Sequence, residues 1–200
     1  LLLRWLLRRR SNVMDKKSIR IILEDGRVFT GRVFASGGDR YGEIIFNTAM
    51  VGYQELLTDP SYTGQAVVMT YPQMGNYGIN ETDFDSRKIF LEAMIVKEYI
   101  AHPSNFTETR TLAEYLEHHQ VLGIEDGDTR ALTKHIRERG ACKAVMTQCD
   151  GSVEMFVERL RRTNFFFVAC ILITPVAYEP KLFACLRRTT SSLYLIPLPL

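Results

Sequence analysis

The 200-residue sequence is 46% hydrophobic and 24% charged, which suits one ordinary globular domain with some additional residues at its ends. Its formal net charge is only +2, and four arginines lie within residues 1–13, so the central part is mildly acidic. A basic stripe of the kind that binds nucleic acid is missing, and no nucleic-acid partner is expected. The cysteines, Cys142, Cys149, Cys170 and Cys185, form no CxxC pair and have no histidine at zinc-finger spacing. We therefore expect reduced thiols in a cytoplasmic protein, with neither a metal site nor a disulfide framework.

The first 13 residues differ in pattern from the rest of the chain. Their apolar side chains precede the arginines, which is the reverse of a secretory signal, and the segment is too short to span a membrane. We interpret residues 1–13 as an unstructured or non-native extension before Met14. A fragment of an arginine-rich transit peptide is the alternative. Residues 14–164 are expected to form the folded domain.

Residues 165–200 form a hydrophobic tail without helical or alternating periodicity. The apolar run in this tail is shorter than the ~20 residues that a membrane helix requires, so no membrane partner is expected. A fragment of a core, an interaction tail and a shifted reading frame remain open as explanations. We favour the shifted frame, because nothing earlier in the sequence prepares a domain that needs such a segment.

Strand signals dominate from Ile19 onward. Residues Ile19–Leu23 and Val28–Phe34 are apolar-rich runs, and the Asp25-Gly26 pair between them predicts a β-hairpin closed by a type I′ turn. Further short apolar runs are of the right length for buried strands. These runs are Ile44–Phe46, Ala66–Met69, Met94–Val96 and Ala144–Met146.

Helix signals occur later in the chain. Thr111 and Glu114 form a capping-box pattern at the start of one helix. Asp128 is expected to cap a second helix over residues 129–139, which Gly140 ends, and Ser152 to cap a third. The order predicts an α+β fold, a layered β/β/α domain of short strands followed by helices.

Glycine and proline are concentrated between Gly42 and Asn80, which predicts several sharp turns between short strands. This stretch also contains sequence blocks that resemble the carbamoyl-phosphate synthase small-chain family. The blocks occur in the family's order: Phe46–Glu55, Leu57–Tyr62, Thr70–Pro72 and Gly75–Asn80, continued by Pro103–Phe106, Asp128–Thr133 and Ile136–Ala141. The resemblance extends from Ile19 to Thr163. It departs from the family pattern at Asp126-Gly127, where an apolar residue usually follows the glycine.

The resemblance implies the N-terminal domain of the small, glutamine amidotransferase subunit. In that family the domain contacts the large subunit, and the complex makes carbamoyl phosphate from glutamine, bicarbonate and ATP for pyrimidine and arginine synthesis. ATP and magnesium act in the large subunit, so no cofactor is expected in this chain. The partners implied are the large subunit and L-glutamine. By resemblance Ser61, in the Asp-Pro-Ser block, is the glutamine-binding residue, a role compatible with a place in a turn or helix cap.

The family's glutaminase chemistry requires a cysteine on a sharp turn, activated by a histidine that an acidic residue orients. No cysteine here has that setting, and every histidine precedes Cys142, the reverse of the family's order. No catalytic residue is therefore assigned in this chain. A non-catalytic interaction module, or a truncated or frame-shifted fragment without activity, is the alternative function. His118-His119, the Gly75–Gly78 turn and Glu125–Asp128 lack the spacing of metal, phosphate-loop and EF-hand sites.

Overall fold

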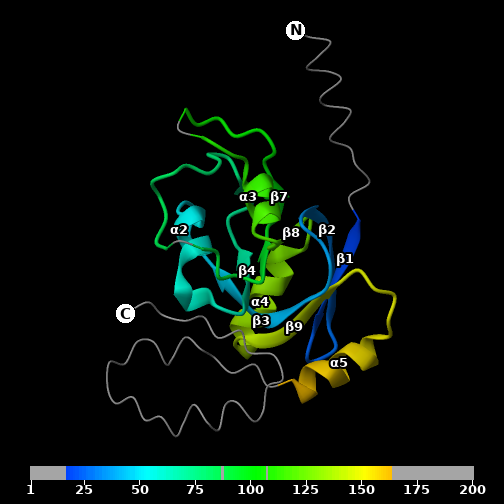
Figure 1. The fold of residues 1–200 in the computed structure, drawn as a ribbon. Helices are drawn as coiled ribbons and strands as arrows, with labels where there is room; N and C mark the ends of the chain where they lie inside the picture. The colour runs from blue at the N-terminus through cyan, green and yellow to red at the C-terminus, as the bar shows by residue number, and fades with distance from the viewer. Residues whose placement is uncertain (1–16, 87, 107, 164–200) are drawn as a thin grey trace, which may run out of the picture. The chain divides into compact units, whose positions relative to one another are not determined.

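The fold was analysed in a computed structural model, which describes residues 17–86, 88–106 and 108–163 (Figure 1). The predictions for residues 1–13 and 165–200 concern segments outside the described residues. No helix in the described part of the chain is long and apolar enough to cross a membrane.

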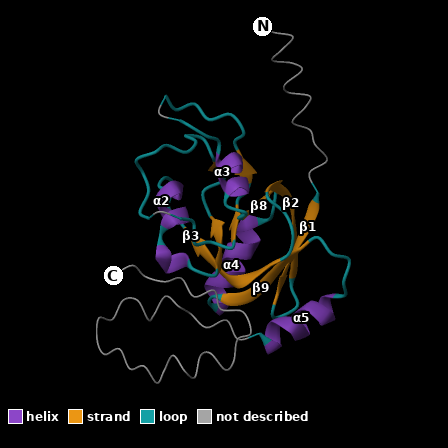
Figure 2. Cartoon of the chain, in the orientation of Figure 1, coloured by secondary structure: helices purple, strands orange, loops and turns teal. Residues whose placement is uncertain are grey.

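Seven strands close into a barrel in the order β1-β2-β8-β6-β4-β3-β9. Figure 2 shows the strands of this sheet with helices around them. The pairs β3/β4, β4/β6 and β6/β8 are parallel, and the remaining neighbours are antiparallel. Two further strands form a small parallel sheet. The barrel strands are β1 Ser18–Leu23, β2 Val28–Ala35, β3 Arg40–Asn47, β4 Gln65–Met69, β6 Ala93–Ile95, β8 Leu122–Glu125 and β9 Cys142–Thr147, and the small sheet is β5 Gln73–Met74 with β7 Glu98–Tyr99.

The mixture of helices and strands confirms the predicted α+β class, but the layered arrangement is not confirmed because the strands close into a barrel. The predicted order of strands followed by helices is wrong. Parallel neighbours need a crossover connection, and helices serve this purpose between β3 and β4 and between β6 and β8. The helical segments are α2 Tyr53–Thr58, the 3₁₀ turn η1 Pro60–Tyr62, α3 Leu112–His118, α4 Thr129–Arg139 and α5 Val153–Arg162.

The first hairpin is present, but its predicted type I′ turn is wrong. Gly26 has φ of 88°, whereas Asp25 does not have the positive φ that a type I′ turn needs at both central residues. The Gly26 N–H donates to the Leu23 carbonyl at 2.9 Å, and the Leu23 N–H donates to the Arg27 carbonyl at 2.9 Å. This pattern fits a three-residue loop, in which a glycine with positive φ follows an ordinary turn.

The three predicted helix starts are confirmed. Thr111 and Glu114 form both hydrogen bonds of a capping box at α3. The Asp128 carboxylate accepts from the Ala131 N–H at 3.0 Å, and Ser152 caps α5 in the same way. Gly140, with φ of 89°, ends α4 as expected.

Alternation along the barrel strands separates two apolar clusters. On β4, Ala66 and Val68 belong to one cluster, and Val67 between them belongs to the other. The first cluster joins the barrel strands to α4 through Leu132 and Ile136. The second packs the opposite strand face against α2 and α3. These helices thereby fix the connections that carry the family-like blocks.

Candidate functional site

Ser61, the predicted glutamine-binding residue, lies in η1 directly after α2. The Asp59 carboxylate accepts a hydrogen bond from the Ser61 N–H at 2.8 Å and so caps this short turn. The Ser61 side chain is exposed, and its hydroxyl hydrogen bonds to none of the residues that the structure describes. A turn position and an available hydroxyl are therefore combined at this residue.

Tyr77 caps the start of α2 from a distant part of the chain. Its hydroxyl oxygen accepts from the N–H of Gly52 at 2.8 Å and from the N–H of Tyr53 at 2.9 Å. Gly52 has φ of 82° and supplies no side-chain cap of its own. The two tyrosine rings stack with centroids 4.1 Å apart, and the Tyr53 hydroxyl donates to the Gly78 carbonyl at 2.7 Å. Burial raises the pKa of both phenols, so both remain neutral donors or acceptors near pH 7.

Gln54 and Asn80 join α2 to the end of the same distant loop. The Gln54 side-chain amide donates to the Asn80 carbonyl at 2.8 Å, and the Asn80 N–H donates to Gln54 Oε1 at 3.0 Å. Both residues are buried. Two reciprocal bonds in a buried setting fix the register of the loop against the helix.

The loop before α2 exposes apolar side chains. Asn47 shapes the loop, since its Oδ1 accepts from the Ala49 N–H at 2.6 Å and its Nδ2 donates to the Tyr62 hydroxyl at 3.0 Å. Met50 and Val51 follow with exposed fractions of 68% and 69%. The region therefore exposes a hydroxyl at Ser61 and two apolar side chains, groups that suit binding more than proton transfer.

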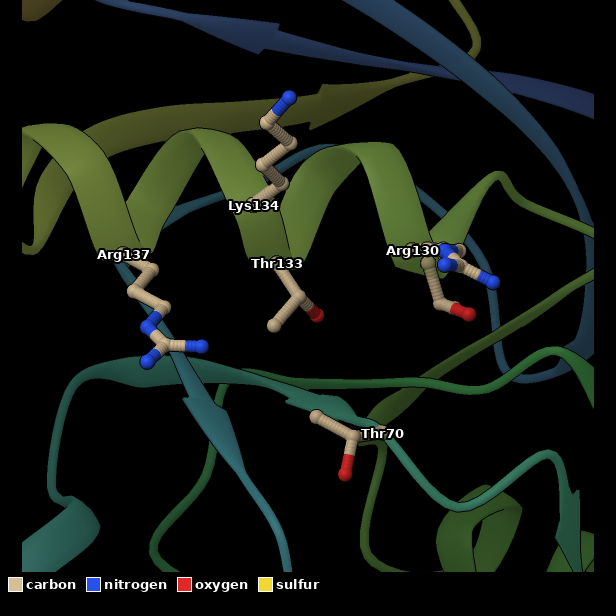
Figure 3. A pocket seen from close by; sticks show the side chains of 6 residues that line it. Thr70, Arg130, Thr133, Lys134 and Arg137 are labelled. Carbon is tan, nitrogen blue, oxygen red and sulfur yellow. The ribbon is translucent and has the colours of Figure 1, made fainter.

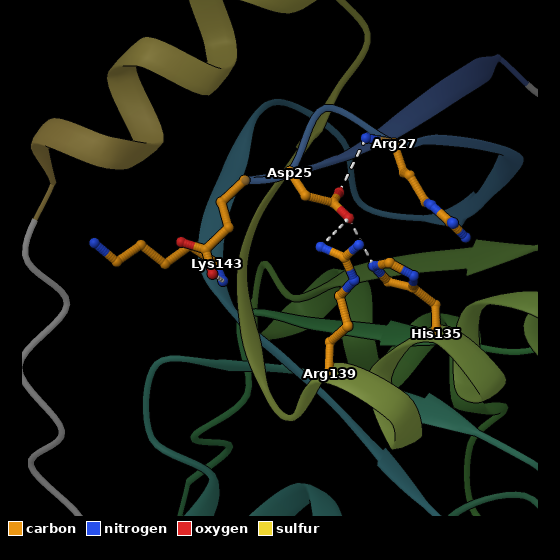
Figure 4. Close-up of polar contacts among 6 residues, drawn as sticks. Asp25, Arg27, His135, Arg139 and Lys143 are labelled. Atoms are coloured by element: carbon orange, nitrogen blue, oxygen red, sulfur yellow. Dashed lines mark hydrogen bonds and ion pairs between the residues drawn. The ribbon is translucent and has the colours of Figure 1, made fainter.

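The described cysteines lack the setting of a nucleophile. Cys142 is half-buried, and burial together with the nearby Glu24 and Asp25 raises its thiol pKa to about 11. The Nε2 atom of the buried His135 lies 3.0 Å from Asp25 Oδ2, and Arg139 lies 3.5 Å from the same oxygen (Figure 4). Both contacts join α4 to the first hairpin. No hydrogen bond between a cysteine and a histidine occurs in the described part of the chain.

Residues considered as possible metal ligands lie at an exposed helix end, in an ion pair and in a helix cap. His118 ends α3 and is exposed, with its ring centroid 5.0 Å from that of His119. Asp126 pairs with Arg32 at 3.1 Å, and Asp128 caps α4. Within residues 17–86, 88–106 and 108–163, no three His, Cys, Asp or Glu side chains gather as a metal site would require.

A cavity of about 400 Å³, lined by residues with polar or basic side chains, lies beside α4 (Figure 3). Arg137 and Thr133 extend from the helix toward the side on which Thr70 lies, whereas Lys134 extends the other way. The lining residues are Thr70, Thr129, Arg130, Thr133, Lys134 and Arg137. The sequence reasoning missed this cavity. Positions 130, 133 and 137 share one helix face by their spacing, which was the available signal.

Comparison with known proteins decides the family. The model of the carbamoyl-phosphate synthase small chain, CPSase domain, matches residues 21–146. The chain belongs to this family. The matched segment contains Ser61, the contacts of Tyr77 and Gln54, and the cavity beside α4.

Relatives agree with this membership. The carbamoyl phosphate synthase small chain of Syntrophotalea carbinolica is 50% identical over 142 residues, which are 71% of this chain and 38% of the relative. The small chain of Oceanobacillus iheyensis is 49% identical over 145 residues, 72% of this chain and 40% of that one. The pyrimidine-specific small chain of Bacillus subtilis is 46% identical over 145 residues, 72% of this chain and 40% of that one. The chain thus spans about two fifths of the length of these relatives.

One solved structure also shows a low similarity to this chain. An aminopeptidase from Aneurinibacillus sp. strain AM-1 is 16% identical, with a TM-score of 0.37 and coverage of 66% of this chain and 30% of that one. A similarity this low supports no conclusion about fold or function.

Proposed function

We propose that this chain serves as the N-terminal domain of a carbamoyl-phosphate synthase small subunit in the cytoplasm. It binds the large subunit and contributes one wall of the glutamine site. The complex makes carbamoyl phosphate from glutamine, bicarbonate and ATP, for pyrimidine and arginine synthesis. ATP and magnesium act in the large subunit, and this chain supplies no catalytic residue and no cofactor site of its own.

The observation that carries the proposal is the family match over residues 21–146, which includes Ser61. Two features of the region support it. The Asp59 cap holds the Ser61 backbone, and the Ser61 hydroxyl is exposed and not engaged with the described residues. A hydroxyl both donates and accepts, so it can bind an ammonium, carboxylate or amide group of an amino-acid ligand.

The large-subunit contact includes the apolar pair Met50 and Val51. Adjacent apolar side chains that are two-thirds exposed are typical of contact surfaces when they lie in a loop fixed by hydrogen bonds. The test is capture of a bacterial carbamoyl-phosphate synthase large chain by the purified 200-residue chain. Replacing both residues with serine is expected to weaken capture at least about tenfold, because apolar anchors carry much of an interface's energy. Met155→Ser on α5, where Met155 is 53% exposed, is the matched control and leaves capture unchanged.

Ser61 is tested in a chimeric small chain in which residues 17–163 replace the matching part of the Oceanobacillus iheyensis relative. Ser61→Ala is expected to raise the KM for glutamine about tenfold, the effect of one lost hydrogen bond to a charged group. Carbamoyl phosphate synthesis from added ammonia stays unchanged, because ammonia bypasses the glutamine site. An unchanged KM for glutamine would remove Ser61 from the proposal.

An interaction module that serves no synthetase is the second candidate, and the exposed Met50 and Val51 also suit it. Capture of the large chain distinguishes the two functions, since the module would not bind it. Under either function the 200-residue chain alone releases no ammonia from glutamine. Ammonia release by the purified chain would contradict the absence of a catalytic role.

A further inference from the structure

The cavity beside α4 concentrates positive charge without a counter-charge. Arg130 and Arg137 form no ion pair with any residue in the described ranges, and none of the six lining residues is acidic. Lys134 pairs with Glu138 at 3.9 Å and extends to the other side of the helix (Figure 3). Guanidinium groups stay charged at all relevant pH values and match oxyanions with paired N–H donors. Both arginines are exposed, and Arg137 extends toward the side on which Thr70 lies (Figure 3).

Thr133 contributes a hydroxyl group that forms no hydrogen bond within the described part of the chain. Its hydroxyl oxygen is buried and has no hydrogen-bond partner within the described part of the chain. A threonine inside a helix commonly bonds the carbonyl four residues earlier, but Thr133 does not. Buried polar groups without partners are rare in folded proteins because each costs stability. The oxygen is closed to solvent as the side chain stands, so it would donate to a ligand in the cavity after a turn of the Thr133 side chain about χ1.

We infer that the cavity binds a small dianion of the phosphate class. The lining contains two arginines without acidic partners in the described ranges, and phosphate oxygens accept from guanidinium and hydroxyl donors alike. At about 400 Å³ the space is within the range of small-molecule sites, so it admits a phosphate with an organic group attached. The inference is independent of the proposed subunit role, because it uses residues of α4 and Thr70 after β4, whereas that role is argued from Ser61, Met50 and Val51.

The test is calorimetric titration of the 200-residue chain with inorganic phosphate, against sodium chloride of equal ionic strength. Wild-type chain is expected to bind phosphate saturably at one site. Arg137→Gln is expected to weaken binding at least about tenfold, the loss of one charge-assisted hydrogen bond. Arg161→Gln removes the same charge from the exposed surface of α5 and is expected to leave binding unchanged.

Thr133→Val provides a second variant with two opposed readouts. It is expected to weaken phosphate binding and to raise the melting temperature in phosphate-free buffer, because it removes an unsatisfied hydroxyl while keeping the side chain's shape. Phosphate heats equal to those of chloride, or equal phosphate affinities in wild type and both variants, would overturn the inference. The inference would also be overturned if the chain binds no phosphate and the variants lose capture of the large chain. That result would assign the cavity to a protein interface.

Discussion

Tyr77→Phe should weaken the fold through two hydrogen bonds at the start of α2. The change removes the oxygen that accepts from the N–H groups of Gly52 and Tyr53, and it keeps the ring that stacks on Tyr53. An orphaned donor costs about 1–3 kcal/mol when buried, and these donors are partly buried, so we expect a loss of about 2 kcal/mol in unfolding free energy. For a domain of this size that corresponds to a melting temperature lower by about 4–8 °C.

Tyr41→Phe provides a matched control for the same chemical change. The Tyr41 hydroxyl is buried and has no hydrogen-bond partner among the described residues. Its removal is therefore expected to leave the unfolding free energy unchanged or to raise it by up to about 1 kcal/mol. Urea denaturation followed by circular dichroism measures both variants. A Tyr77→Phe variant within about 0.5 kcal/mol of wild type would refute the capping role.

Three further changes test other parts of the fold. Asp25→Ala leaves a buried nitrogen of His135 without its hydrogen-bond partner and is expected to cost about 1–3 kcal/mol in urea denaturation, whereas Glu158→Ala at an exposed pair on α5 costs under about 0.5 kcal/mol. Burial raises the pKa of Tyr53, so the folded chain keeps a proton that the unfolded chain loses, and thermal melts should show stability falling above about pH 10. Burial, partly offset by a nearby arginine, raises the pKa of Glu92; Glu92→Gln should therefore stabilise the chain at pH 7 but not below about pH 4.

Local signals in the sequence identified the helix ends well because their partners are close in the chain. The Asp128 carboxylate reaches an N–H only three residues away, and Thr111 and Glu114 satisfy one another across the same interval. Such contacts need only the first turn of the helix, so they can be predicted without knowing the rest of the fold. The type of the first turn could not be obtained in this way, because Asp-Gly fits both a two-residue and a three-residue hairpin loop.

Barrel closure could not be predicted from local pattern. It depends on β1 pairing with β9, for example Ile22 with Val145, across more than a hundred residues. Strand β8 was missed for a related reason. Its Gly123 weakens a strand signal, yet the position needs a glycine, because a Cβ there would lie 2.7 Å from the Phe34 ring. Only the folded arrangement reveals that requirement.

The candidate site likewise combines local contacts, which the sequence indicates, with contacts between distant residues, which it does not. The glutamine-binding role of Ser61 is a prediction from resemblance, and the cap that Asp59 provides fits the turn expected there. The contacts from Tyr77 and Gln54 span about 25 residues and follow no periodicity. They give a physical reason why the widely spaced sequence blocks Phe46–Glu55 and Gly75–Asn80 occur together, because hydrogen bonds between the two blocks fix their relative position.

Asp59→Ala and Tyr77→Phe should separate the two parts of the proposed function. Asp59 holds the Ser61 N–H after the end of α2, whereas Tyr77 fixes the start of α2 beside Met50 and Val51. In the chimera, Asp59→Ala is expected to raise the glutamine KM with large-chain capture unchanged, because a lost N-cap loosens only the adjacent turn. Tyr77→Phe, assayed below its melting temperature, should weaken capture and leave KM unchanged. Equal effects of both variants on both measurements would mean that the two ends of α2 do not act independently.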